Sequence, residues 1–131
     1  MDVLFKQLDE TLEAPAYARP GDAGLDLRAA EGGTLLPFER ALVPCGIALA
    51  VPEGYAGLII PRSGLAARQG ISIVNAPGLI DSGYRGEIKV PLRNQGSEPY
   101  TVQPGERIAQ MLVVPVLTPE LTLTDDLGSS E

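Results

Sequence analysis

The amino-acid sequence predicts an all-β domain with one short helix, and three observations lead to this prediction. Short apolar and β-branched runs recur along the chain, each bounded by Gly, Pro, Asn or Asp, as in strands joined by turns. The 15 glycines and 12 prolines are spread evenly and do not mark one linker. Only one segment has the composition of a helix. Many short strands of this kind favour a sandwich, a barrel or a jelly roll.

Eight segments are predicted as strands from their composition and from the turn formers at their ends. They are residues 3–8, 25–28, 41–51, 55–60, 71–74, 87–93, 99–102 and 107–117. The turn sequences at 52–54 (PEG) and 103–105 (QPG) predict hairpin-type connections between neighbouring strands.

The one predicted helix follows the strand at 55–60. Ser63 is suited to cap it, residues 65–69 are helix formers, and Gly70 suits the left-handed residue that ends a helix. A helix of two turns is unstable alone, so we expect Leu65 to hold it against the sheet.

Residues 75–87 are predicted to form a tight hairpin with arms at 79–80 and 88–90. Its tip carries an isolated acid, Asp81, followed by Tyr84. A carboxylate on a rigid turn can orient a water, and the Tyr can offer a flat face to a ring. The alternative is that Asp81 only satisfies the turn backbone and Tyr84 only covers the core.

The length of 131 residues fits one domain. We assign it to residues 1–117, because residues 118–131 lose the apolar periodicity and end in acids, Gly and Ser. That last segment is predicted to be mobile.

Composition excludes several classes of site. The chain has no histidine, so acid–base chemistry falls to carboxylates, Lys, Tyr or water. Its single cysteine, Cys45, excludes an internal disulfide and a thiolate-rich zinc site, and is expected to be a small buried apolar residue.

The net charge of −7 argues against nucleic-acid or anionic membrane partners, although a local cluster of arginines can still bind an anionic small molecule. No run reaches the roughly 18 apolar residues of a membrane span, so a soluble, cytoplasmic protein is expected.

Polar residues in three places indicate chemistry. Arg62 and Ser63, with the backbone N–H groups at the start of the helix, could bind phosphates, although an ordinary Ser cap is the simpler reading. Asp26 is an acid in an apolar context and needs a partner or an ion. Gln110 is a polar residue in a strand that otherwise looks buried.

Taken together, four motifs stand in a recognisable order. They are AGLDL at 23–27, PRSGL at 61–65, GLID with YRGE across 78–87, and GERIAQ at 105–110. This series closely resembles the trimeric deoxyuridine triphosphatases (dUTPases), and the resemblance extends over residues 6–117. It implies a distorted jelly roll of the β-clip barrel type, a homotrimer in which three subunits share each active site, and hydrolysis of dUTP to dUMP and pyrophosphate.

The resemblance also implies roles for single residues on the nucleoside side. Asp81 matches the acid that activates the water attacking the α-phosphorus, and Tyr84 matches the ring that leaves no room for a 2′-hydroxyl. The groups that match those reading the uracil edge are Asn75 and the backbone around Leu79, Ile80 and Lys89.

On the phosphate side, Arg62, Ser63 and Gly64 match phosphate ligands, and Gln110 matches a group near the α-phosphate. Asp26 matches an acid that supports the water shell of a Mg²⁺ ion held by the triphosphate. The family also carries a Gly-rich C-terminal arm, and no such motif follows Leu127. The sequence leaves open whether that arm is truncated or absent, and the expectation is reduced activity for the chain as it stands.

Two other functions compete with this one. The related dCTP deaminases share the fold. Their motif reads Arg-Ser-Ser, however, where this chain has Arg62, Ser63 and Gly64. A non-catalytic nucleotide-binding or partner-binding trimer is the second rival, and for that role Asp81, Tyr84 and Gln110 together would be unnecessary.

Overall fold

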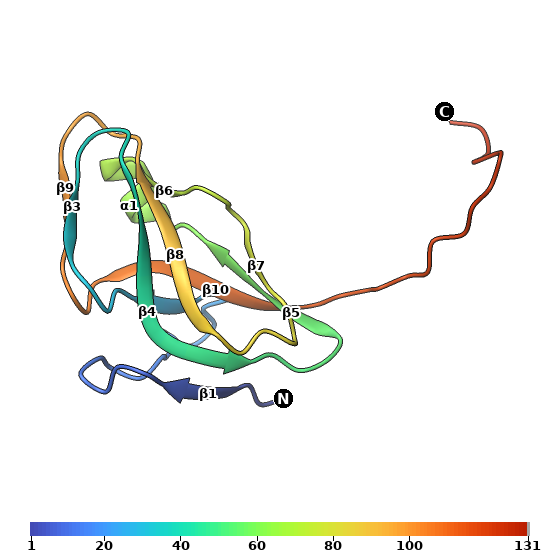
Figure 1. Cartoon of the computed structure of the whole chain (residues 1–131), viewed down its shortest axis with the longest axis horizontal. Coiled ribbons are helices and arrows are strands. Elements are labelled where there is room, and N and C mark those ends of the chain that lie inside the picture. Colours follow the sequence, from blue (N-terminus) through green and yellow to red (C-terminus); the bar gives the residue numbers. More distant parts are fainter. Residues whose placement is uncertain (131) are drawn as a thin grey trace.

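Two four-stranded antiparallel sheets and one two-stranded ribbon make up the computed structural model, which describes residues 1–130 (Figure 1). The elements in chain order are β1 (Leu4–Gln7), β2 (Leu25–Arg28), β3 (Gly33–Leu35), β4 (Arg40–Ala50), β5 (Tyr55–Ile60), α1 (Ser63–Gln69), β6 (Ile71–Ile73), β7 (Gly78–Ile80), β8 (Glu87–Asn94), β9 (Tyr100–Val102) and β10 (Arg107–Pro115). The predicted all-β class with one short helix is confirmed.

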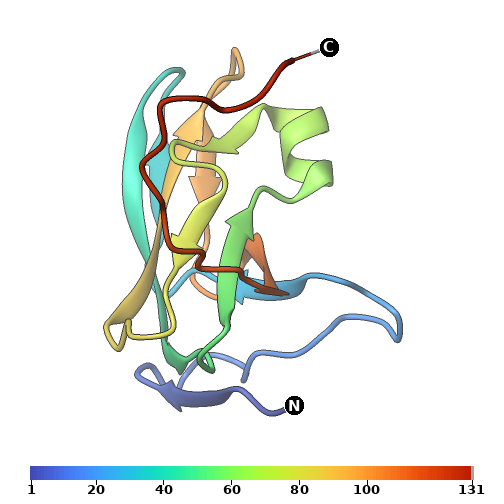
Figure 2. The same cartoon turned by 90° about the vertical axis from the view of Figure 1, so that its right-hand side faces the viewer.

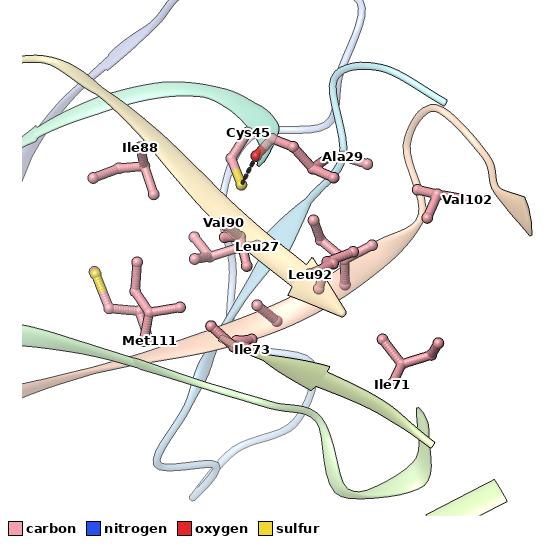
Figure 3. Packing of buried hydrophobic residues seen from close by; sticks show 14 of the residues in the cluster. Leu27, Ala29, Cys45, Ile71, Ile73, Ile88, Val90, Leu92, Val102 and Met111 are labelled. Atoms are coloured by element: carbon pink, nitrogen blue, oxygen red, sulfur yellow. Dashed lines mark hydrogen bonds between the residues drawn. The ribbon is translucent and has the colours of Figure 1, made fainter. Parts of the chain in front are cut away.

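The strand order is β1-β4-β8-β6 in one sheet and β2-β10-β5-β7 in the other, while β3 pairs with β9. Both larger sheets are open over the described residues, so the fold is a distorted jelly roll in which neither sheet closes into a barrel. Their facing sides form one apolar cluster (Figure 3). Leu27, Ile88 and Met111 are almost fully buried in it.

Cys45 lies in this cluster with 2% of its surface exposed, as expected for a small buried residue. Burial, and to a smaller extent the charge of Glu87, raise the pKa of the thiol to about 12. The thiol is therefore protonated and unreactive at neutral pH.

The helix begins at Ser63, one residue earlier than predicted, because Ser63 was expected to be the cap that precedes it. Arg62 is the N-cap residue, with extended backbone (φ −80°, ψ 129°) and no side-chain capping bond, and Ser63 is already inside the first turn. The predicted Ser63 cap is therefore wrong, because Arg62 is the last residue with extended backbone before the chain turns into the helix. Gly70 ends the helix at φ 69° and Leu65 packs against the core, as predicted.

The predicted hairpin at 75–87 is also wrong as a paired hairpin. The chain does turn there, since the Tyr84 N–H donates to the Asp81 carbonyl at 3.1 Å. However, β7 pairs only with β5, whereas β8 pairs with β4 and β6, so this turn carries the chain from one sheet to the other.

The turns at 52–54 and 103–105 behave in the same way. They close with hydrogen bonds from Tyr55 to Pro52 and from Glu106 to Gln103, yet the strands on either side belong to different sheets. Turn residues determine where the chain reverses, but the pairing partner is chosen by packing with distant strands.

Residues 118–130 form no helix or strand and extend away from the sheets (Figure 1). Their predicted mobility, and a domain boundary at 117, stay predictions. Within residues 1–130, no helix is both long and apolar enough to cross a membrane.

Candidate active site

Gln110 occupies the centre of the candidate site because β10 lies between β2 and β5. In the registers of these strands Gln110 is opposite Asp26 on one side and Ile60 on the other. Its amide nitrogen donates to the Pro61 carbonyl at 3.1 Å. A Cβ on Gly24 would overlap the Gln110 side-chain oxygen, so the glycine of the AGLDL motif leaves room for this amide.

Asp26 is paired with two arginines. Its carboxylate lies 3.7 Å from Nε of Arg62 and 3.5 Å from Nη1 of Arg107, and its side chain is 16% exposed. Arg62 also donates through Nη1 to the Arg107 carbonyl at 3.1 Å. The predicted need of Asp26 for a partner is met, and this network fixes the direction of both guanidinium groups.

These side chains line an open pocket of about 530 Å³ beside the start of α1. The pocket brings together five of the predicted residues, namely Asp26, Arg62, Ser63, Gly64 and Gln110, and adds Arg19, Asp22 and Arg107. With three arginines against two aspartates, its lining carries a net positive charge in a chain of net charge −7. Such a lining favours an anionic ligand.

Sequence reasoning assigned no role to Arg107 or Arg19. Arg107 lies three residues before Gln110 in the GERIAQ motif, and the local bend between Arg107 and Ala109 in the β2–β10 register allows both to line the pocket. Arg19 stands in a loop without regular structure, where the sequence gives no positional signal.

The second group of predicted residues lies at the turn between β7 and β8. Asp81 is exposed there, and Tyr84 is 43% exposed with its hydroxyl donating to the Glu87 carbonyl at 2.7 Å. A Cβ on Gly86 would overlap that hydroxyl. The glycine therefore lets the Tyr84 ring lie against its own turn.

Strands β7 and β8 each have one edge whose backbone, along all or part of its length, is not paired with another strand. β7 is an edge strand that pairs only with β5, and β8 pairs with β6 only from residue 92 onward. The backbone around Leu79, Ile80 and Lys89 is therefore free of strand partners along these edges, and the exposed Asn75 precedes β7. Free backbone donors and acceptors of this kind can bind the edge of a planar ring.

Within one chain, the two groups stay apart. Gln110 is opposite Ile60 of β5, whereas Ile80, the residue before Asp81, is opposite Gly57 on the other side of that strand. Four residues along β5 and two strand spacings across it separate Gln110 from Asp81 by roughly 16 Å. Asp81 and Gln110 of one chain are therefore too far apart to contact the same substrate atom.

Over residues 1–130 no three His, Cys, Asp or Glu side chains stand close enough together to hold a metal ion. Asp26 alone provides a carboxylate in the pocket's network, which fits a Mg²⁺ ion that binds mainly through substrate phosphates and water.

A family model described as dUTPase matches residues 10–131. The chain belongs to the dUTPase family. Among its relatives, the deoxyuridine 5′-triphosphate nucleotidohydrolase of Anaeromyxobacter sp. (strain Fw109-5) is 57% identical over 119 residues, which cover 91% of this chain and 81% of that protein. The one from Thermobifida fusca (strain YX) is 52% identical over 129 residues, covering 98% and 72%.

Solved dUTPase structures have the same fold. The Staphylococcus bacteriophage 80alpha dUTPase, solved as a mutant with dUpNHpp, superposes with a TM-score of 0.90 at 28% identity and covers 98% of this chain and 99% of that one. The dUTPase of phage phi11 of S. aureus, solved as a mutant, reaches 0.89 at 27% identity, with coverage of 97% and 99%. That structure shows the coordination of a structural Mg(II) ion. The predicted family is confirmed.

Proposed function

We propose that this dUTPase family member hydrolyses dUTP to dUMP and pyrophosphate by attack of water on the α-phosphorus. The reaction limits uracil in DNA and supplies dUMP for dTMP synthesis. The observation that carries the proposal is the cationic pocket in which Arg62, Ser63 and Gln110 converge around Asp26, in a chain with the dUTPase motifs in order.

The pocket beside α1 binds the triphosphate in this proposal. Arg62 supplies charge, and the Ser63 hydroxyl and the free N–H groups of Ser63 and Gly64 supply donors, because the first N–H groups of a helix have no partner within it. Gln110, held by the Pro61 carbonyl, faces the α-phosphate. Neutralising the phosphate oxygens lowers the barrier to attack by water.

Asp81 accepts the proton of the attacking water in this proposal. It is exposed on a turn that the Tyr84 N–H closes by donating to the Asp81 carbonyl, and this bond constrains the backbone that carries the carboxylate. Alignment of the water provides much of the rate in such a reaction.

The nucleoside binds between β7 and β8. The unpaired backbone around Leu79, Ile80 and Lys89, with Asn75, offers fixed donors and acceptors to the uracil edge. Cytosine presents the reversed pattern and would leave polar groups unpaired. The Tyr84 ring, tied to its turn through Glu87, excludes a 2′-hydroxyl.

Mg²⁺ is the proposed cofactor, and Asp26 would support it through bound water. When bound, the ion neutralises phosphate charge and polarises the α-phosphorus.

A homotrimer with shared sites is the proposed assembly. The separation of roughly 16 Å between Asp81 and Gln110 in one chain supports it, because a water and the α-phosphorus must be near both residues. We also propose a cytoplasmic location, for which the single reduced, buried Cys45 is suited.

The test is to incubate the purified chain and Mg²⁺ separately with dUTP, UTP and dCTP and to identify the products by chromatography. Formation of dUMP and pyrophosphate from dUTP alone supports the proposal. Conversion of dCTP to dUTP would identify a deaminase, and binding of dUTP without turnover would identify a nucleotide-binding protein.

A further inference from the structure

The loop that precedes β2 adds an arginine to the pocket that none of the motifs includes. This loop projects from the body of the molecule (Figure 2). Within it, the Arg19 N–H donates to the Asp22 carboxylate at 2.9 Å, and the Asp22 N–H donates to the Arg19 carbonyl at 3.2 Å. The two bonds close a turn that fixes the backbone of Arg19 at the pocket wall.

The guanidinium of Arg19 differs from the other two in the pocket because it is not engaged. Arg62 and Arg107 both pair with Asp26, and Arg62 also donates to the Arg107 carbonyl. Among residues 1–130, Arg19 makes neither an ion pair nor a side-chain hydrogen bond. An exposed cation that lines an anion pocket without an internal partner is available for a ligand.

We propose that Arg19 binds the terminal phosphate of the triphosphate and so favours the substrate over the monophosphate product. The inference rests on the proposed function. Gln110 lies against Gly24 in the pocket lining, and the proposed function places the α-phosphate there. Arg19 stands five residues before Gly24, in the projecting loop, and lines the same pocket, so we assign to it the phosphate farthest from the α-position.

Charge supports the same assignment. Arg62 and Arg107 share the charge of Asp26, and the Asp22 carboxylate accepts from the Arg19 backbone N–H, so Arg19 is the arginine of the lining whose guanidinium has no partner among the described residues. Without Arg19 the lining would be neutral, although its ligand carries several negative charges. Removing Arg19 should therefore weaken binding of the triphosphate without altering the nucleoside contacts.

The experiment compares the Arg19→Gln variant with Arg40→Gln as a matched control. Arg40 is an exposed arginine at the start of β4 and does not line the pocket, so both variants lose the same charge. Binding of dUpNHpp and of dUMP is measured for each by calorimetry with Mg²⁺, and kcat and KM are measured with dUTP.

Arg19→Gln should weaken dUpNHpp binding by about ten- to a hundredfold, the range for a hydrogen bond to a charged group. It should leave dUMP binding within about twofold, and it should raise the KM for dUTP more than it lowers kcat. Arg40→Gln should resemble the wild type.

Unchanged dUpNHpp binding in Arg19→Gln, or an equal loss for dUpNHpp and dUMP, would overturn the assignment of Arg19. These outcomes leave the proposed function standing as long as the wild type hydrolyses dUTP. A wild type that neither binds dUpNHpp nor turns over dUTP would instead refute the function.

Discussion

Asp81 lies exposed at the turn between β7 and β8, where no described side chain bonds to its carboxylate. The Asp81→Asn variant keeps the shape of the residue and removes the base. We expect turnover of dUTP to fall by about 10²- to 10⁴-fold, the usual contribution of a general base, while dUpNHpp binds almost as in the wild type. Steady-state kinetics and calorimetry measure the two effects, and near-normal turnover would contradict the role of Asp81.

Tyr84 presents a half-exposed ring that its hydroxyl bond to Glu87 holds in place. If the ring blocks a 2′-hydroxyl, Tyr84→Ala should raise UTP hydrolysis relative to dUTP, because the steric obstacle is gone. Tyr84→Phe is the control, since it removes the Glu87 bond and keeps the ring, and it should retain the preference. The ratio of kcat/KM for the two nucleotides is the measurement. A ratio that stays the same in Tyr84→Ala would make Tyr84 a packing residue.

Phe38 has a left-handed backbone, with φ 69°, and its side chain is 70% exposed. The turn that contains Phe38 has the same form as the turn at Gly105, with a Pro followed by a left-handed residue and a Glu. The Glu39 N–H donates to the Leu36 carbonyl in the first turn, and the Glu106 N–H donates to the Gln103 carbonyl in the second, both at 3.0 Å. A non-glycine residue in this conformation costs about 1–2 kcal/mol.

The Phe38→Gly variant should therefore raise the free energy of unfolding by about 1 kcal/mol and the Tm by several degrees, measured by thermal and denaturant unfolding. The opposite substitution in the matching turn, Gly105→Ala, should lower both. No stabilisation in Phe38→Gly would mean that the Phe side chain makes contacts that offset its backbone strain.

At the scale of elements, the β2–β10 register determines where the Gln110 side chain lies in the candidate site. It places Gly24 against the side-chain oxygen of Gln110, and a Cβ at position 24 would displace that amide from the Pro61 carbonyl. We expect Gly24→Ala to keep the fold, since a flexible side chain gives way, and to lower kcat about tenfold or more through loss of α-phosphate alignment. Similar kinetics in Gln110→Ala, and no further loss in the double variant, would show that both changes act on one group. Unaltered turnover in Gly24→Ala would separate Gln110 from catalysis.

Sequence patterns predicted the positions of the elements better than their partners. The bounds of β2 and β5 agree with the prediction, because apolar runs between turn residues are local signals. β3 was missed, since Gly-Thr-Leu is short and is stabilised by pairing with Tyr100–Val102 far along the chain. The turn after Ile80 was wrongly predicted to join paired strands, whereas β7 and β8 belong to different sheets. Local residues specify where the chain reverses, but strand pairing depends on packing with distant segments.

For the whole molecule, the motifs predicted a set of candidate site residues. Only the strand registers show that this set forms two separate groups on one chain. Asp26, Arg62, Ser63, Gly64 and Gln110 line one pocket, whereas Asp81 and Tyr84 lie elsewhere on the same chain. Arg19 and Arg107 complete the pocket from positions to which the sequence pattern assigned no role. This division supports the proposed homotrimer, for which light scattering should give a mass of about three times 13.8 kDa.

Shared sites can be tested more sharply by subunit mixing. The Asp81→Asn chain lacks the base and keeps the pocket, while the Gln110→Ala chain lacks the pocket amide and keeps the base. We propose that each site combines Asp81 of one chain with Gln110 of another. Unfolding and refolding the two impaired variants together in equal amounts should then restore about a quarter of wild-type activity, because random exchange in a closed ring gives that share of intact sites. Each variant refolded alone is the control and should keep only its own residual activity, which for Gln110→Ala is about tenfold or more below that of the wild type. Mixed samples without restored activity, in preparations shown to contain mixed oligomers, would mean that one chain builds the whole site by a rearrangement of the β7–β8 turn.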